Sequence, residues 1–146
     1  MRVMVWGDSL TRVSLDNAKR IAGRNTVAGA VLKKPIENIA IKGIDIYFVP
    51  NDSTILANAV KGNGPILLLP SHYKATPDFL KTVNPLIDEG NELVTWDFDE
   101  GYSAAVSARS LFFCLSERGC EALRSNLNNL NYLHNYHVPE HLFCRI

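Results

Sequence analysis

Two aspartates in the second half of the chain have the spacing of a metal-binding pair. Asp97 and Asp99 stand one residue apart in the segment WDFDEGYSAA (96–105), directly after an apolar run that predicts a strand. Carboxylates at a strand end can hold a divalent cation between them, because Mg²⁺ and Mn²⁺ prefer oxygen ligands. The sequence therefore predicts a Mg²⁺ or Mn²⁺ site at Asp97 and Asp99, completed by Asp8 or Asp52.

The acid pair and its flanking segments resemble the DxD segment of Toprim domains. These are the metal-binding α/β modules of DnaG-type primases, topoisomerases and related nucleases. The resemblance covers about residues 44–118, where strand PILLLPS, a helix at 76–89, strand ELVTW, the acids and another helix are expected in turn. It implies metal-dependent chemistry on nucleotides or nucleic acid. Toprim domains also place a catalytic Glu at the end of their first strand, and this chain has no Glu there.

A second motif lies near the N-terminus. The segment VWGDSLT (5–11) resembles the nucleophile block of GDSL-type (SGNH) esterases. The resemblance implies that Ser9 is a nucleophile, Gly7 a turn residue and Asn51 an oxyanion donor. Those esterases also need an Asp-x-x-His block, which is absent from this sequence. The alternative is a helix N-terminus at which Asp8 and Ser9 cap backbone N–H groups.

The C-terminal segment HNYHVPEHLFC is rich in zinc-binding residue types. Its spacing is H-x2-H-x3-H-x2-C, and the four candidate ligands are His134, His137, His141 and Cys144. Zinc bound by these four side chains is one interpretation. The alternative is that the rings pack on the domain or mediate self-association.

Three further residues are candidates for binding a ligand. Arg12 follows the first predicted strand, and a cation there suits a phosphate-bearing ligand, although solvated charge on the polar face of a helix is the usual explanation. Asn51 and His72 follow later predicted strands, at the edge where α/β sheets bind their ligands. The sequence contains neither G-x-G-x-x-G nor a Walker motif.

Hydrophobic periodicity predicts the elements that position these residues. Apolar and β-branched runs indicate strands at 2–6, 26–32, 37–41, 44–49, 65–71 and 92–98, and helical spacing indicates helices at 10–22, 52–60, 76–89, 104–118 and 120–130. Lys42-Gly43 predicts a hairpin turn between two of the strands. Strands that alternate with helices favour a mainly parallel sheet. We expect a single three-layer α/β domain over 1–146, with helices on both faces, an N-terminal β-hairpin insertion and a helical C-terminus.

Composition excludes several classes of protein. The chain has 146 residues, of which 47% are hydrophobic, and 15 basic residues balance 15 acidic ones. A strongly basic nucleic-acid binder is therefore not indicated. No apolar run approaches the length of a membrane span, and the N-terminus does not resemble a signal peptide. Three cysteines without such a signal indicate reduced thiols and a cytoplasmic location.

Charge is distributed unevenly along the chain. Residues 1–73 carry a net charge of +4 and residues 74–146 a net charge of −4, and the run 88–100 contains six acids and no Lys or Arg. Such a run is either a metal or recognition surface or simply a solvated face. Opposite charges on one chain favour association, so we expect a homo-oligomer or a protein partner.

These observations support three hypotheses of function. The first is a small nucleotide- or nucleic-acid-related protein with a divalent-metal site at a strand end. The alternative is a non-catalytic, oligomeric module that binds a phosphorylated small ligand or a protein. The third is a GDSL-type esterase that uses Ser9.

Overall fold

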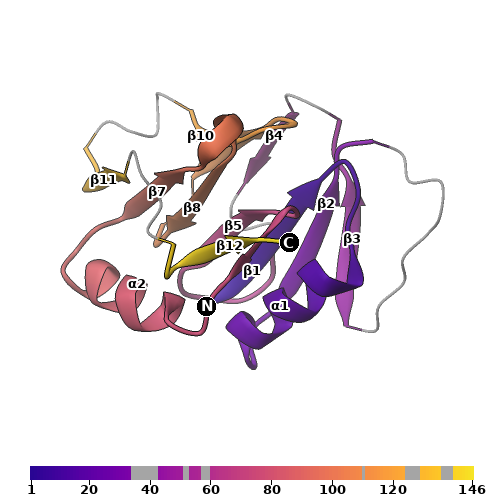
Figure 1. Ribbon diagram of the computed structural model, residues 1–146. Helices are drawn as coiled ribbons and strands as arrows, with labels where there is room; N and C mark the ends of the chain where they lie inside the picture. Colours follow the sequence, from indigo (N-terminus) through magenta and orange to yellow (C-terminus); the bar gives the residue numbers. More distant parts are fainter. Residues whose placement is uncertain (34–42, 51–52, 57–59, 110, 124–128, 136–139) are drawn as a thin grey trace.

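A seven-stranded sheet runs through the molecule (Figure 1). The computed structural model describes residues 1–33, 43–50, 53–56, 60–109, 111–123, 129–135 and 140–146. In spatial order the strands are β11 (Tyr132–Asn135), β7 (Leu93–Asp97), β8 (Ser103–Ser107), β5 (Ile66–Pro70), β1 (Arg2–Gly7), β2 (Val27–Val31) and β3 (Ile44–Phe48). Only β8 runs antiparallel to its neighbours among these strands. The predicted α/β fold with a mainly parallel sheet is confirmed.

The centre of the sheet is made by β1 and β5. Both strands are buried along their whole length, which explains why they are continuous apolar runs in the sequence. Gly7 lies close to Ser71 at the C-terminal ends of the two strands. A Cβ atom on Gly7 would lie 2.1 Å from the Ser71 hydroxyl oxygen, so this close approach requires glycine.

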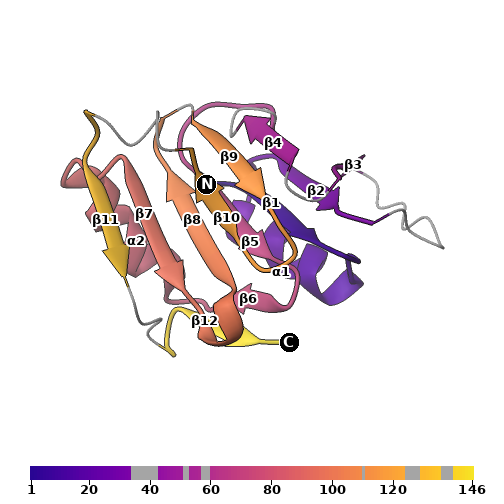
Figure 2. The ribbon, with the colours of Figure 1, turned by 90° about the horizontal axis from the view of Figure 1, so that it is seen from above.

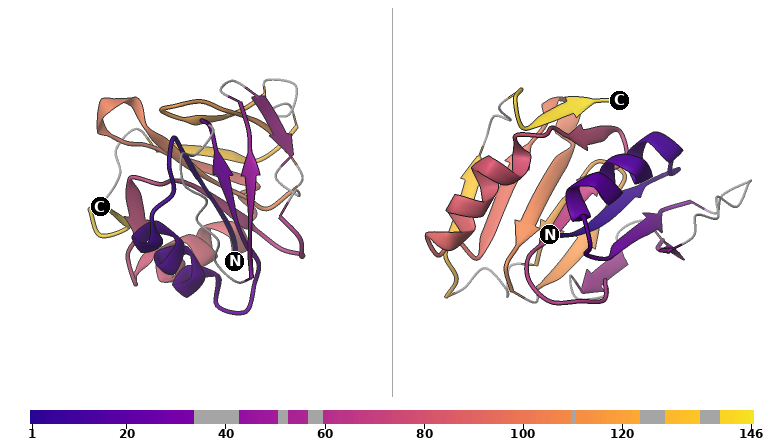
Figure 3. Two further views of the ribbon diagram at one scale, coloured as in Figure 1. Left: turned by 90° about the vertical axis from the view of Figure 1, so that its right-hand side faces the viewer. Right: turned by 90° about the horizontal axis from the view of Figure 1, so that it is seen from below.

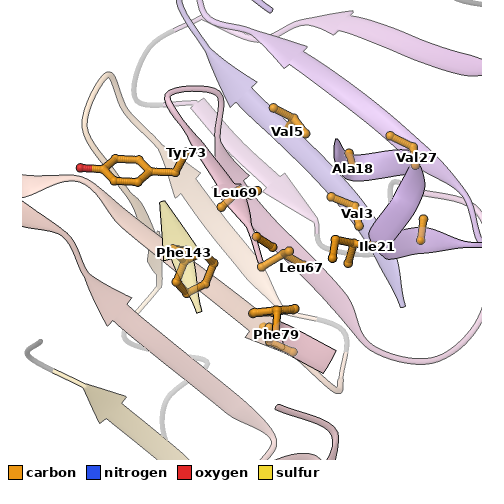
Figure 4. Close-up of a cluster of buried hydrophobic side chains, with 14 of the residues drawn as sticks. Val3, Val5, Ala18, Ile21, Val27, Leu67, Leu69, Tyr73, Phe79 and Phe143 are labelled. Carbon is orange, nitrogen blue, oxygen red and sulfur yellow. The ribbon is translucent and has the colours of Figure 1, made fainter. Parts of the chain in front are cut away.

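Two helices and a two-stranded ribbon cover one face of the sheet (Figures 1 and 3). The helices are α1 (Arg12–Ala22) and α2 (Phe79–Asp88), and the ribbon pairs β6 (Tyr73–Ala75) with β12 (Phe143–Arg145). Their buried side chains form one cluster with those of the sheet, part of which Figure 4 shows. Phe79 and Phe143 are neighbours in this cluster, with ring centroids 5.3 Å apart. The cluster joins α1, α2 and the ribbon to the same face of the sheet.

Helix α1 begins two residues later than the sequence suggested. Thr11 is the N-cap: its hydroxyl accepts a hydrogen bond from the Ser14 N–H, and the Ser14 hydroxyl accepts one from the Thr11 N–H. The interpretation of Asp8 and Ser9 as the capping residues is therefore wrong. Gly23 ends the helix with φ 59°, as its position after the apolar pattern predicted.

A three-stranded antiparallel sheet covers the opposite face. It consists of β4 (Ser53–Leu56), β9 (Phe112–Leu115) and β10 (Cys120–Ala122), and Figure 2 views the molecule from this side. Phe113 and Leu115 are buried against the central sheet in one cluster with Trp6. The Trp6 indole N–H also donates to the Ser116 carbonyl oxygen at 3.2 Å. Both described helices thus lie on one face, and strands cover the face where further helices were expected.

The helix predicted over 104–118 is wrong. Residues 103–107 form β8, and residues 112–115 form β9, which belongs to a different sheet. Ala104, Ala105 and Val106 are all buried, because β8 lies inside the sheet between β5 and β7. A strand buried on both faces has no polar alternation, so its run of small apolar residues matched helical spacing by coincidence.

Two other predicted elements also differ from the structure, and the predicted hairpin lies partly outside the described residues. The segment 52–60, predicted as a helix, contains strand β4. The segment 120–130, also predicted as a helix, begins with strand β10, and its residues 124–128 lie outside the described part. The first strand of the predicted hairpin (37–41) and Lys42 also lie outside it, and β3 pairs in parallel with β2. In the described C-terminal part, short strands replace the predicted helix. Pairing with β9 in the folded domain makes β4 and β10 strands, although their local hydrophobic pattern matches a helix.

Candidate functional site

A pocket of about 410 Å³ opens between the β9–β10 hairpin and the end of the central sheet formed by β7, β8 and β11. Figure 2 shows these five strands. Side chains and glycines from all five line it: Leu93, Thr95, Asp97, Gly101, Ser103, Cys114, Ser116, Arg118, Gly119, Cys120, Glu121, Ala122, Tyr132 and His134. Its volume is at the lower end of the range for small-molecule sites.

Four polar side chains meet on one wall of this pocket. Thr95 and Asp97 lie two residues apart on β7, and Tyr132 and His134 lie two residues apart on β11. Successive side chains of a strand point to opposite faces, so each pair shares a face. The parallel register places His134 directly beside Thr95. Strand geometry therefore brings two short alternating segments together as one cluster.

Hydrogen bonds join the four side chains into a continuous relay. His134 Nε2 lies 3.0 Å from Asp97 Oδ2. On the other side of the ring, His134 Nδ1 lies 2.6 Å from Thr95 Oγ1 and 2.9 Å from the Tyr132 hydroxyl oxygen. The two hydroxyl oxygens are 3.1 Å apart. We name this set, Asp97, His134, Thr95 and Tyr132, the relay.

The partners of the His134 ring fix its tautomer. A carboxylate only accepts hydrogen bonds, so the Nε2–H donates to Asp97. In the neutral imidazole Nδ1 then carries a lone pair, which accepts a hydrogen bond from a neighbouring hydroxyl. The side chains of Asp97 and His134 are 47% and 24% exposed, so the relay is open to the pocket. A base oriented by a carboxylate and in contact with a hydroxyl is the arrangement of nucleophilic hydrolases.

The β9–β10 turn forms the facing rim of the pocket. The Ser103 hydroxyl accepts a hydrogen bond from the Cys120 N–H at 3.0 Å, and the Ser103 N–H donates to the Arg118 carbonyl oxygen at 3.1 Å. A Cβ atom on Gly119 would lie 2.8 Å from the Ser103 hydroxyl, so glycine allows the turn to lie this close to β8. These contacts fix the backbone that carries the exposed Arg118 side chain at the rim.

Cys120 contributes to the buried end of the pocket. Burial raises the pKa of the Cys120 thiol, because the thiolate loses its hydration. The group is therefore a neutral thiol at physiological pH, and it does not supply a nucleophilic sulfur.

The structure places the predicted Mg²⁺ or Mn²⁺ ligands in different surroundings. Asp97 lines the pocket, and Asp99 lies in a 3₁₀ turn (Asp99–Gly101), with its side chain outside the described part. Asp8 follows β1 and forms an ion pair with Lys33 at 3.1 Å, and β5 and β8 lie between β1 and β7. Asp52 lies outside the described residues. No group of three potential ligands occurs among the residues that were described, and the metal site stays a prediction.

The predicted zinc ligands are divided between two strands. His134 belongs to the relay on β11, whereas Cys144 lies on β12, which packs on the opposite face of the sheet. His141 is exposed, and its carbonyl oxygen accepts a hydrogen bond from the Thr76 hydroxyl. His137 lies outside the described residues. The structure does not bring His134 and Cys144 together.

The remaining predicted residues lie away from the pocket. Ser9 and Arg12 are exposed near the start of α1. His72 is exposed after β5, and its ring lies 5.0 Å from that of Tyr102. Asn51 is outside the described part. Ser9 is not hydrogen-bonded to a histidine in the part of the chain that is described, so the esterase motif lacks the neighbour that would activate it.

The comparisons with known proteins give no family. No known family model matches the chain, and no curated protein matches it. Among the described residues, no helix has the length and apolar composition needed to span a membrane.

Sequence reasoning missed Thr95 and Tyr132. The signal was present in the alternating segments T-W-D and Y-L-H, which place two polar residues on one face if each segment is a strand. No element was predicted over 131–135, so its pairing with β7 could not be anticipated.

Proposed function

We propose that the protein is an enzyme that hydrolyses or transfers a phosphate ester in the relay pocket. In this mechanism His134 is the general base, and Asp97 orients its ring and stabilises the imidazolium that forms. The observation that carries the proposal is the continuous chain of hydrogen bonds from Asp97 through His134 to two hydroxyl groups.

The order of these contacts supports acid–base chemistry. A histidine that only stabilises a sheet edge needs one partner, whereas His134 has a carboxylate on Nε2 and hydroxyls on Nδ1. Because the carboxylate contacts Nε2 and the hydroxyls contact Nδ1, a hydroxyl proton can move to Nδ1, and the carboxylate stabilises the imidazolium that this transfer produces. The pocket beside the ring gives room for a small substrate.

Arg118 favours an anionic substrate. Its guanidinium is permanently charged, and its fork of N–H donors matches two oxygens of a phosphate group. It lines the same pocket as the relay. Nucleotides and nucleic acids are phosphate esters, so this proposal keeps the substrate class expected from the sequence.

The test is hydrolysis of p-nitrophenyl phosphate and bis-p-nitrophenyl phosphate by the purified chain. We expect measurable turnover by the wild type and a loss of about 10²–10⁴-fold in kcat for His134→Asn, the range for removal of a general base. Asp97→Asn is expected to lower kcat as well, whereas Asp88→Asn, a matched change of an exposed carboxylate at the end of α2, leaves it unchanged. Equal rates for the wild type and His134→Asn would refute the proposal.

A divalent cation at Asp97 and Asp99 is a second candidate. The observation that favours it is the half-exposed Asp97 carboxylate in the pocket wall, with Oδ2 bonded to His134. A ligand that binds only the folded chain raises the unfolding midpoint. We expect Mg²⁺ or Mn²⁺ to raise Tm of the wild type and not of Asp97→Asn/Asp99→Asn. A response to Zn²⁺ alone would favour the His/Cys segment, and no response to any cation counts against both metal sites.

A further inference from the structure

We propose that Tyr132 is the nucleophile of the relay pocket, and that the reaction passes through a covalent phosphotyrosine. This inference rests on the proposed phosphoester activity and identifies the atom that attacks the phosphorus. If Tyr132 were not the nucleophile, the same pocket could activate a water molecule to attack the phosphorus directly.

Tyr132 has both the contact and the access that a nucleophile needs. Its hydroxyl oxygen lies 2.9 Å from His134 Nδ1, within reach of proton transfer to the base. The residue is 44% exposed and lies on β11, at the edge of the sheet. Its ring therefore stands at the open side of the pocket, where a phosphate ester can approach the oxygen.

Thr95 is the competing hydroxyl, and its position is less suitable. Its oxygen lies closer to His134 Nδ1, at 2.6 Å, but the residue lies on β7, between β11 and β8, and is half-buried. A phenol also gives up its proton far more readily than an aliphatic alcohol. We assign Thr95 as a positioning residue, because its hydroxyl lies within 3.1 Å of the tyrosine oxygen and in contact with the histidine.

The proposed reaction balances without any further reactant except water. The Tyr132 oxygen forms a bond to phosphorus while the bond from phosphorus to the leaving oxygen breaks. The phenolic proton moves to His134 Nδ1 and from there to the leaving oxygen. In the second half, a water oxygen attacks the same phosphorus, its proton moves to Nδ1 and the bond to Tyr132 breaks. The tyrosine oxygen then takes the proton back, and the site returns to its starting state.

Diisopropyl fluorophosphate tests this assignment directly. An activated hydroxyl attacks its phosphorus, fluoride leaves, and the proton goes to the neighbouring base, so the nucleophile keeps a stable adduct. We expect peptide mapping by mass spectrometry to find the adduct on Tyr132 in the wild type. Tyr132→Phe and His134→Asn are expected to lose it. Thr95→Ser keeps a hydroxyl and is expected to retain labelling, while Thr95→Val slows it.

Tyr47 provides the matched control. It is an exposed tyrosine on β3, at the opposite edge of the sheet, and it measures the background reactivity of a surface phenol. We expect Tyr132 to be labelled at least about tenfold faster than Tyr47. An adduct on Thr95 or Ser9, or labelling of Tyr132 no faster than that of Tyr47, would overturn the assignment. Circular dichroism and Tm of each variant show that the fold is retained.

Kinetics separates failure of this inference from failure of the proposed function. If nitrophenyl phosphate turnover depends on His134 while Tyr132→Phe retains the wild-type rate, the pocket is an enzyme site and water is the nucleophile. That result rejects the inference alone. If the wild type neither turns over the esters nor labels at Tyr132, both proposals fail.

Discussion

Cys120 is the residue whose protonation depends most directly on the fold. It is buried in the cluster beneath β9 and β10, and burial raises its thiol pKa above the ordinary value. In the unfolded chain the same thiol ionises near pH 8.5. The Cys120 thiol is therefore protonated in both the folded and the unfolded chain at neutral pH, whereas at alkaline pH it keeps its proton only in the folded chain.

This difference predicts a pH dependence of stability. Above about pH 8.5 the unfolded chain loses a proton that the folded chain keeps, so the free energy of unfolding falls as pH rises, by up to about 1.4 kcal/mol per pH unit. Cys120→Ala lacks this contribution. Urea unfolding at pH 7.0, 8.5 and 9.5 is expected to give a steeper alkaline decline for the wild type than for the variant. Parallel curves would contradict the prediction.

At the residue scale, sequence reasoning found half of the site. Asp97 and His134 were both identified as chemically important, but they were assigned to different metals in different segments. Their contact depends on the parallel register of β7 and β11, which are separated by about 35 residues of chain. Local pattern carries no information about that register, since partners far apart in sequence are selected by packing.

At the scale of elements, the buried amide of Asn17 links α1 to β6. Asn17 Oδ1 accepts a hydrogen bond from the Ala75 N–H at 3.0 Å, and Asn17 Nδ2 donates to the Ala75 carbonyl oxygen at 2.8 Å. Arg20 donates to the same carbonyl oxygen at 2.9 Å. Ala75 also pairs with Phe143 of β12, so this junction links the helix to the ribbon.

Removal of the amide is expected to destabilise the fold. Asn17→Ala leaves the Ala75 N–H without its side-chain acceptor, and a buried unsatisfied group of this kind costs about 1–3 kcal/mol. Asp16→Ala, an exposed change on the same helix, is expected to stay within about 0.5 kcal/mol of the wild type. Urea unfolding measures both. If the two variants have equal stability, the junction does not contribute as described.

The elements that the sequence predicted correctly share one property. Strands β1, β2, β5 and β7 and helices α1 and α2 have clear punctuation or strong periodicity, such as Gly23 after α1 and Thr76-Pro77-Asp78 before α2. The segments that failed, 104–118 above all, contain small apolar residues without alternation. A strand that is buried on both faces is recognised by its large and β-branched apolar residues, which β1 and β5 have and the segment SAAVS (103–107) largely lacks.

At the scale of the molecule, the order of the strands predicts where the fold is most resistant to opening. β1 and β5 are paired on both sides, whereas β3 and β11 lie at the two edges of the sheet. Opening of a central strand requires loss of both buried clusters, so its amides exchange only through near-global unfolding.

Hydrogen exchange measured by mass spectrometry checks this expectation. We expect the peptides that contain β1 and β5 to exchange most slowly and those that contain β3 and β11 to exchange at least about tenfold faster. Binding of inorganic phosphate in the pocket is expected to slow exchange in β11 and to leave β3 unchanged. Equal protection of β11 and β1 would contradict this ranking.

The oligomer inferred from the uneven charge stays a prediction, which sedimentation at low and high salt can test.

The place of β11 in the chain has a consequence for biosynthesis. Strand β1 precedes the other described strands in the chain and lies near the centre of the sheet, and it gains its partner β5 only after residues 66–70 have emerged. Thr95 and Asp97 are synthesised later, and Tyr132 and His134 can contact them only after residues 132–135 have emerged. A nascent chain can therefore pair most of the strands of its sheet while the relay is still missing, and the relay forms only after residues 132–135 have emerged.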